Sequence, residues 1–91
     1  MFVVDTTGGA EALEITTALR RVGIRVDRAY ESRSMKSQMK VADRSGAAIA
    51  LIVGSDELEQ GVVTLRPLRG EDRQYPVPRA ELIESVEKAL T

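Results

Sequence analysis

The chain has 91 residues, of which 43% are hydrophobic and 30% charged, and its formal net charge is −1. This length suffices for one domain with one modest core, and the composition is that of an ordinary soluble globular protein. Cysteine and histidine are both absent, which excludes disulfides, thiolate nucleophiles, histidine general bases and the usual zinc ligands. We therefore expect no catalytic residue set, no metal site and no cofactor.

No stretch of the sequence has the length or composition of a secretory signal or a membrane span. We accordingly expect a single domain over residues 1–91, located in the cytoplasm and not associated with membranes.

The charges are distributed unevenly along the chain. Residues 20–44 hold eight basic and three acidic side chains, whereas the remainder holds five basic and eleven acidic ones. A net charge of −1 argues against binding nucleic acid by overall charge alone. Any binding to nucleic acid would therefore depend on the local excess of basic residues at 20–44. The alternative interpretation is that these charges only solvate two helices and an edge strand.

The first part of the chain predicts a strand, a helix and a second strand. Residues 2–4 are apolar and enter a polar turn, and a helix follows whose apolar residues recur at spacings of three and four. Gly23 is suited to the left-handed cap that ends this helix. Residues 24–29 alternate in polarity, as in a strand with one wet side near a sheet edge. The two strands should be parallel, with a right-handed crossover between them.

A second helix is expected between Ser34, as its N-cap, and Gly46. Its inward positions are apolar: Met35, Met39 and Ala42. Its outer positions form a basic stripe: Lys36, Lys40 and Arg44.

Residues 47–53 are apolar without interruption, between Gly46 and Gly54. The run is too short for a membrane span and too uniformly apolar for a half-exposed strand, so we predict a central strand covered on both faces. Such strands belong to α/β layer architectures, in which ligands bind beyond the carboxyl ends of the strands. Ser55, Asp56 and Glu57 follow at that end.

The last part predicts two strands and a helix. The connection over residues 55–60 is too short for a crossover helix, so a strand over residues 61–68 should run antiparallel to its predecessor. Residues 69–72 read as a hairpin turn, and residues 73–77 as a short strand limited by Pro76 and Pro78. A helix over residues 80–90 closes the chain, with one apolar face: Leu82, Ile83, Val86, Ala89 and Leu90. The expected fold is a three-layer α/β/α sandwich with a five-stranded mixed sheet, in the order βαβαβββα.

This order comes together with three motifs, YESRSMKSQMKVAD at residues 30–43, VGSDE at 53–57 and GVVTLR at 61–66. In this combination the chain resembles the anticodon-binding domain of class IIa aminoacyl-tRNA synthetases, and most of all the C-terminal domain of the histidyl-tRNA synthetase family. The resemblance implies binding to the anticodon loop of a histidine tRNA, whose anticodon in the family is GUG. Histidine activation and transfer would belong to the catalytic domain of a larger, homodimeric parent protein.

The resemblance also implies site residues. In the related threonyl enzymes, a glutamate matching Glu57 and an arginine matching Arg66 lie against anticodon bases. Ser32 stands where that relative has an asparagine, which departs from the pattern and suggests a different anticodon. Three basic residues are expected to meet phosphates: Arg33, Lys36 and Lys40. Tyr30 is expected to stack on an extruded base, or else to be half-buried in the core.

Alternative interpretations exist for Glu57 and Arg66 and for the whole chain. Glu57 could simply solvate or cap a turn, and Arg66 could pair on the surface with Glu59 or Glu71. The chain could be a stand-alone paralogue that serves as a regulatory or protein-interaction module. A third hypothesis is a small flavodoxin-like enzyme that uses Asp5, Asp56 or Glu57.

Overall fold

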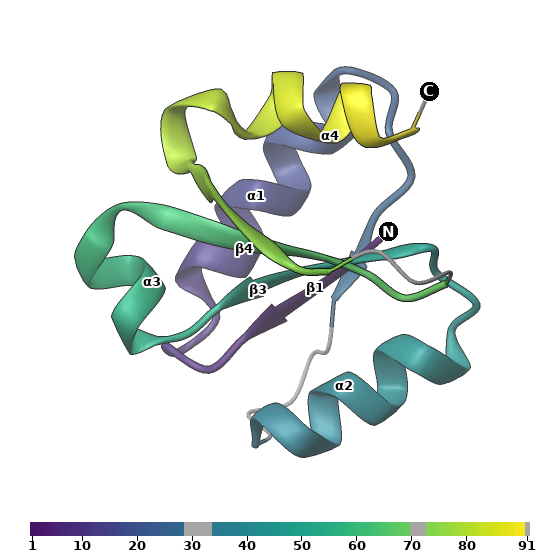
Figure 1. Ribbon diagram of the computed structural model, residues 1–91, viewed down its shortest axis with the longest axis vertical. Helices are drawn as coiled ribbons and strands as arrows, with labels where there is room; N and C mark the ends of the chain where they lie inside the picture. Colours follow the sequence, from purple (N-terminus) through teal and green to yellow (C-terminus); the bar gives the residue numbers. More distant parts are fainter. Residues whose placement is uncertain (29–33, 70–72, 91) are drawn as a thin grey trace.

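The computed structural model describes residues 1–28, 34–69 and 73–90, and within these residues the strands form a five-stranded mixed sheet of order β2-β1-β3-β4-β5. The elements are β1 (Phe2–Asp5), α1 (Ala10–Arg21), β2 (Asp27–Arg28), α2 (Met35–Arg44), β3 (Ile49–Val53), α3 (Ser55–Gln60), β4 (Val62–Pro67), β5 (Tyr75–Pro78), the 3-10 turn η1 (Arg79–Glu81) and α4 (Leu82–Leu90). Helices α1 and α4 lie on one side of the sheet and α2 lies on the other (Figure 1). The predicted three-layer α/β/α fold is confirmed.

Strand β3 is the middle strand of the sheet, and every one of its residues is buried. It pairs in parallel with β1 and antiparallel with β4, as expected for a short connection between β3 and β4. Its side chains alternate between the two sides of the sheet, with Leu51 in one core cluster and Ala50 in the other. The uninterrupted apolar run is therefore explained by cover on both faces.

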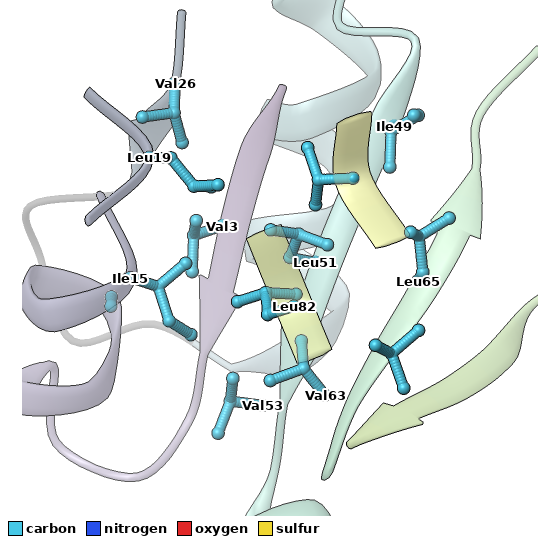
Figure 2. Close-up of a cluster of buried hydrophobic side chains, with 13 residues drawn as sticks. Val3, Ile15, Leu19, Val26, Ile49, Leu51, Val53, Val63, Leu65 and Leu82 are labelled. Carbon is cyan, nitrogen blue, oxygen red and sulfur yellow. The ribbon is translucent and has the colours of Figure 1, made fainter. Parts of the chain in front are cut away.

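The side of the sheet that faces α1 and α4 is closed by a continuous hydrophobic core, and we call it the closed face. Figure 2 shows Ile15 and Leu19 of α1 beside Val3 of β1, with Leu82 of α4 over the middle of the sheet. The buried members of this cluster are Val3, Ala12, Ile15, Leu19, Val26, Ile49, Leu51, Val53, Val63, Leu65, Val77, Leu82 and Val86. Each fully buried leucine or isoleucine contributes about 1.5 to 3 kcal/mol, so most of the hydrophobic stabilisation lies here.

Among the described residues, α2 is the helix that covers the opposite side of the sheet. Its buried cluster is smaller and consists of Phe2, Val4, Ala42, Ala50 and Ile52. Met35 and Met39 pack against this cluster as partly buried side chains. The inward positions predicted for this helix are therefore confirmed, and they lie over β1 and β3 rather than over β4 and β5.

Helix α2 is also tied to β1 by polar contacts. The side-chain amide of Gln38 donates to the backbone carbonyl of Asp5 at 2.8 Å, and the backbone N–H of Asp5 donates to Oε1 of Gln38 at 3.0 Å. Within the described residues β2 pairs with Phe2 and Val3, and at Asp5 the amide of Gln38 takes the place of a ladder partner. The buried carboxylate of Asp5 accepts from the backbone N–H of Ala12 at 3.0 Å and so anchors the start of α1.

The predicted helix ends at Gly23 and Ser34 are confirmed. Gly23 has a φ of +82° and donates to the carbonyl of Arg20 at 3.1 Å, while Ile24 donates to that of Leu19 at 3.0 Å. These two bonds form a Schellman cap. Ser34 accepts from the backbone N–H of Ser37 at 3.2 Å as the N-cap of α2.

Two predicted elements need correction. The second strand was expected over residues 24–29, but β2 contains only Asp27 and Arg28 among the described residues. The guanidinium of Arg20 donates to the carbonyl of Val26 at 2.8 Å, directly before this short strand. Residues 55–60, expected as a short connection, form the short helix α3.

The end of the chain differs in two further details. Pro76 and Pro78 lie inside β5 instead of limiting it, which an edge strand tolerates because one row of its backbone groups has no partner strand. The last helix starts with the 3-10 turn η1, and its final residues Ala89 and Leu90 are exposed rather than part of the buried face.

Candidate nucleic-acid interface

The half of the sheet that α2 leaves uncovered forms a surface on β4 and β5, which we call the open strip. Residues Val63 and Leu65 of β4 point into the closed face, so the alternate residues point to the α2 side. On β5, Val77 likewise belongs to the closed face. The open strip consists of Val62, Thr64, Arg66, Pro76 and Pro78. Arg66 and the two prolines are exposed, and Val62 and Thr64 are half-buried.

Glu57 lies at one end of the open strip. A Cβ atom added to Gly54 would stand 3.4 Å from Oε1 and 3.6 Å from Oε2 of Glu57, so the carboxylate rests against the Gly54 backbone. Gly54 follows Val53, which points into the closed face, and the missing side chain of Gly54 would therefore point to the α2 side. Glu57 thus reaches the same side of the sheet as the open strip.

Arg66 occupies the other end of the open strip. It pairs directly with Ala50, whose side chain belongs to the α2 side of the sheet. Gly54 and Ala50 are four positions apart on one extended segment, which separates the two ends of the strip by roughly 13 Å. Glu57 and Arg66 therefore lie on the same side of the molecule, at opposite ends of one surface.

Neither member of this pair is engaged elsewhere in the part of the chain that the structure describes. Glu57 and Arg66 have no hydrogen bond or ion pair with any residue in these ranges, and Arg66 has no contact with Glu59 of the kind considered from the sequence. The other surface partner considered, Glu71, lies outside the described residues. Glu57 also stands in the first turn of α3, where an acidic side chain contributes about 0.3 to 1 kcal/mol through the helix dipole.

The basic stripe lies on the outer face of α2. Lys36, Lys40 and Arg44 are all exposed, on the helix that borders the open strip's side of the sheet. Lys36 and Lys40 have no ion pair with any residue inside the described ranges. The other predicted site residues, Tyr30, Ser32 and Arg33, lie outside the described residues.

The sequence reading missed the middle of the open strip, namely Val62, Thr64, Pro76 and Pro78. A signal for it was present, because residues 63–66 alternate between Val63 and Leu65 on one side and the more polar Thr64 and Arg66 on the other. Such alternation indicates a strand with only one covered face.

A separate groove lies on the closed-face side of the sheet. Its volume is about 570 Å³, and its lining combines apolar side chains with two arginines, Arg69 and Arg73. Tyr75 and Leu90, which are 44% and 51% exposed, contribute to its wall. Because Tyr75 pairs with Leu65, it points away from the open strip, so the groove and the strip are distinct surfaces.

Some kinds of site are not found within residues 1–28, 34–69 and 73–90. No helix in these ranges combines the length and the apolar composition needed to cross a membrane. No group of three or more acidic, histidine or cysteine side chains gathers there closely enough to hold a metal ion.

Comparison with known protein families shows which family this chain belongs to. A family model described as the anticodon binding domain matches residues 2–89. The chain belongs to this family. The predicted resemblance is therefore confirmed over nearly the whole chain.

The histidyl branch is confirmed by relatives and by solved structures. The histidine–tRNA ligase of Rhodococcus erythropolis is 51% identical to the chain over 74 residues, which cover 76% of the chain and 18% of the ligase. The histidyl-tRNA synthetase of S. aureus superposes with a TM-score of 0.79 and 32% identity, covering 92% of the chain and 25% of that structure. The enzyme of Nostoc sp. gives a TM-score of 0.83 at 28% identity, covering 99% and 22%. The chain thus spans a quarter or less of the length of these relatives.

Proposed function

We propose that the chain binds tRNA by recognising the anticodon loop, as the C-terminal domain of a histidine–tRNA ligase. The observation that carries this proposal is the placement of Glu57 and Arg66 at the two ends of one open sheet surface, each without a partner among the described residues. Anticodon bases are read after they leave the stack, through hydrogen bonds on their edges. Side chains held on a rigid sheet are suited to this task.

The two charged ends of the open strip have complementary chemistry. The carboxylate of Glu57 accepts hydrogen bonds from amino or imino groups of a base, and the guanidinium of Arg66 donates to O6 and N7 of guanine or to a phosphate. A good bidentate contact discriminates against the wrong base by about 1 to 3 kcal/mol. We therefore assign base recognition to both residues.

The basic residues around α2 are assigned to the RNA backbone. Lys36 and Lys40 are point charges on flexible stems, which suits phosphate contacts that position the RNA without reading it. We assign the same role to Arg33, a stacking role to Tyr30 and a loop contact to Ser32, on the basis of the family resemblance of residues 30–43.

The larger context forms part of the proposal. We propose that residues 1–91 form one non-catalytic domain, and that histidine activation and transfer take place in the remaining part of a longer, cytoplasmic and homodimeric ligase. The coverage of the relatives, 18% for the Rhodococcus ligase, supports a parent several times longer than this chain.

The test is a titration of the chain with a fluorescently labelled anticodon stem-loop. We expect the GUG loop to bind more tightly than a scrambled loop on the same stem, with an affinity that falls as salt concentration rises because phosphate contacts release counterions. Equal affinity for both loops, together with no salt dependence, would exclude anticodon binding and favour a stand-alone regulatory or protein-interaction module.

Variants then separate the two kinds of contact. Glu57→Gln should lower the preference for the GUG loop, whereas Lys36→Ala should weaken the GUG and scrambled loops by the same factor. The matched controls are Glu59→Gln, on the same short helix, and Lys88→Ala, on α4 across the sheet. A uniform loss in both variants would contradict the assignment of Glu57 to a base.

A further inference from the structure

The open strip is organised as three rows of side chains that cross from β4 to β5. Arg66 forms the first row, opposite Ala50 of β3. Thr64 forms the second row with Pro76, and Val62 forms the third with Pro78. The third row lies at the end of the strip that Glu57 reaches, because Gly54 is the next α2-side position of its strand beyond Ile52, the partner of Thr64.

The spacing of these rows matches unstacked bases better than stacked ones. Consecutive rows are two residues apart, which is roughly 6.6 Å along a strand. Nucleotides stacked in a duplex are only about 3.4 Å apart along each strand. If Glu57 and Arg66 each hold one base, the row of Thr64 and Pro76 between them has room for one more unstacked base.

We propose that the open strip holds three successive unpaired RNA bases, one on each row, and that Thr64 and Pro76 bind the middle base. This inference rests on the proposed anticodon function and extends it to residues for which no role has been assigned. Glu57 and Arg66 then recognise the two outer bases.

The chemistry of the middle row fits a base and not a phosphate. Thr64 and Pro76 carry no charge, and the half-buried hydroxyl of Thr64 both donates and accepts a hydrogen bond. Pro76 presents an exposed, rigid apolar ring beside this hydroxyl. Together they offer one polar contact for the edge of a base and one apolar contact for its face.

The whole strip favours RNA bases over a peptide. Its ends carry opposite charges, which suits base edges because these combine donors and acceptors within one ligand. The outer edge of β5 is a poor template for an added peptide strand, since Pro76 and Pro78 have no backbone N–H to donate. A flat ligand lying on the face of the sheet remains the best match.

The experiment combines protein variants with an RNA that lacks only the middle base. Thr64→Val and Pro76→Ala are titrated with the GUG stem-loop and with the same stem-loop carrying an abasic nucleotide at the middle anticodon position. The controls are Thr17→Val, on the exposed side of α1, and Pro67→Ala, on β4 but facing the separate groove. Thr64→Ser keeps the hydroxyl, and thermal unfolding confirms that each variant is folded.

We expect Thr64→Val to weaken binding of the intact loop about two- to tenfold, as for one hydrogen bond, and to leave binding of the abasic loop unchanged. Pro76→Ala should behave in the same way, with a loss of roughly two- to fivefold for the lost ring contacts. Thr64→Ser and both controls should bind the intact loop like the wild type.

The outcomes separate this inference from the function on which it rests. If the wild type prefers the GUG loop with a salt-dependent affinity, but Thr64→Val and Pro76→Ala affect the intact and abasic loops equally or not at all, the middle-base assignment is overturned and the anticodon function stands. If the wild type shows neither preference nor salt dependence, both are overturned.

Discussion

The two faces of the sheet differ in how completely they are covered. On the closed face, α1 and α4 bury alternate residues from every strand except β2, and Val26 just before β2 joins the same cluster. On the opposite face, α2 covers β1 and β3 and leaves the open strip on β4 and β5 (Figure 1). One strand, β4, therefore contributes Val63 and Leu65 to a core and Thr64 and Arg66 to a surface.

Because of this difference, the residues that stabilise the fold and the residues proposed to bind RNA are different ones, even within one strand. Side chains on the closed face are held by packing, so their replacement should change the free energy of unfolding. Side chains on the open strip have few packing partners, so their replacement should change binding while the fold is preserved. The same strand can then be tested on both faces by neighbouring substitutions.

The largest effect is expected from Leu51→Ala on the closed face. Leu51 is fully buried at the centre of β3, and its truncation should lower the free energy of unfolding by about 2 to 5 kcal/mol through lost burial and an unfilled cavity. Urea denaturation followed by circular dichroism measures this change. Val62→Ala, on the half-buried open strip, is the control and should cost less than about 1.5 kcal/mol. Similar losses in both variants would remove the distinction between the two faces.

The next effect concerns the contact that fixes α2 on its side of the sheet. Gln38→Met keeps the length of the side chain but removes its hydrogen bonds to the N–H and carbonyl of Asp5. Each buried backbone group left unpaired should cost about 1 to 3 kcal/mol of stability. Lys40→Met, on the exposed face of the same helix, should leave the unfolding midpoint nearly unchanged. If Gln38→Met were equally neutral, apolar packing alone would hold α2 on the sheet.

Much of the fold follows from patterns that depend on single elements. The apolar run at residues 47–53 identified the central strand because only cover on both faces permits seven apolar residues in succession. Helix caps such as Ser34 and Gly23 were predictable because they act within a few residues of chain. The antiparallel direction of β4 followed from the length of its connection.

Features that depend on distant residues could not be predicted in the same way. The burial of Gln38 reflects its pairing with Asp5, which lies 33 positions away. The open strip depends on how far α2 reaches across the sheet. Glu57 and Arg66 were found by family resemblance, whereas Thr64 and Pro76 became visible only through the register of β4 and β5.

A third prediction tests the open strip with two arginines on opposite faces. Arg66→Ala should reduce discrimination between the GUG and scrambled stem-loops by about 1 to 3 kcal/mol, the value of a good bidentate base contact. Arg73→Ala removes an exposed arginine that lines the separate groove, and it should leave this discrimination unchanged. Fluorescence anisotropy at one fixed salt concentration measures both. An equal effect of the two variants would mean that arginine charge, rather than position on the open strip, determines binding.

The smallest effect on stability is expected from Gly54→Ala, which tests from which side a base contacts the carboxylate of Glu57. Gly54 has φ −107° and ψ −177°, which alanine adopts without strain, so the unfolding free energy should change by less than about 0.5 kcal/mol. The added methyl group would stand 3.4 Å from Oε1 of Glu57, on the side of the carboxylate that lies against Gly54. If a base reaches Glu57 from that side, affinity for the GUG stem-loop should fall, and the double variant with Glu57→Gln should bind no more weakly than Glu57→Gln alone. Unchanged affinity in Gly54→Ala would mean that a base contacts this carboxylate from the solvent side of α3, beyond the edge of the open strip.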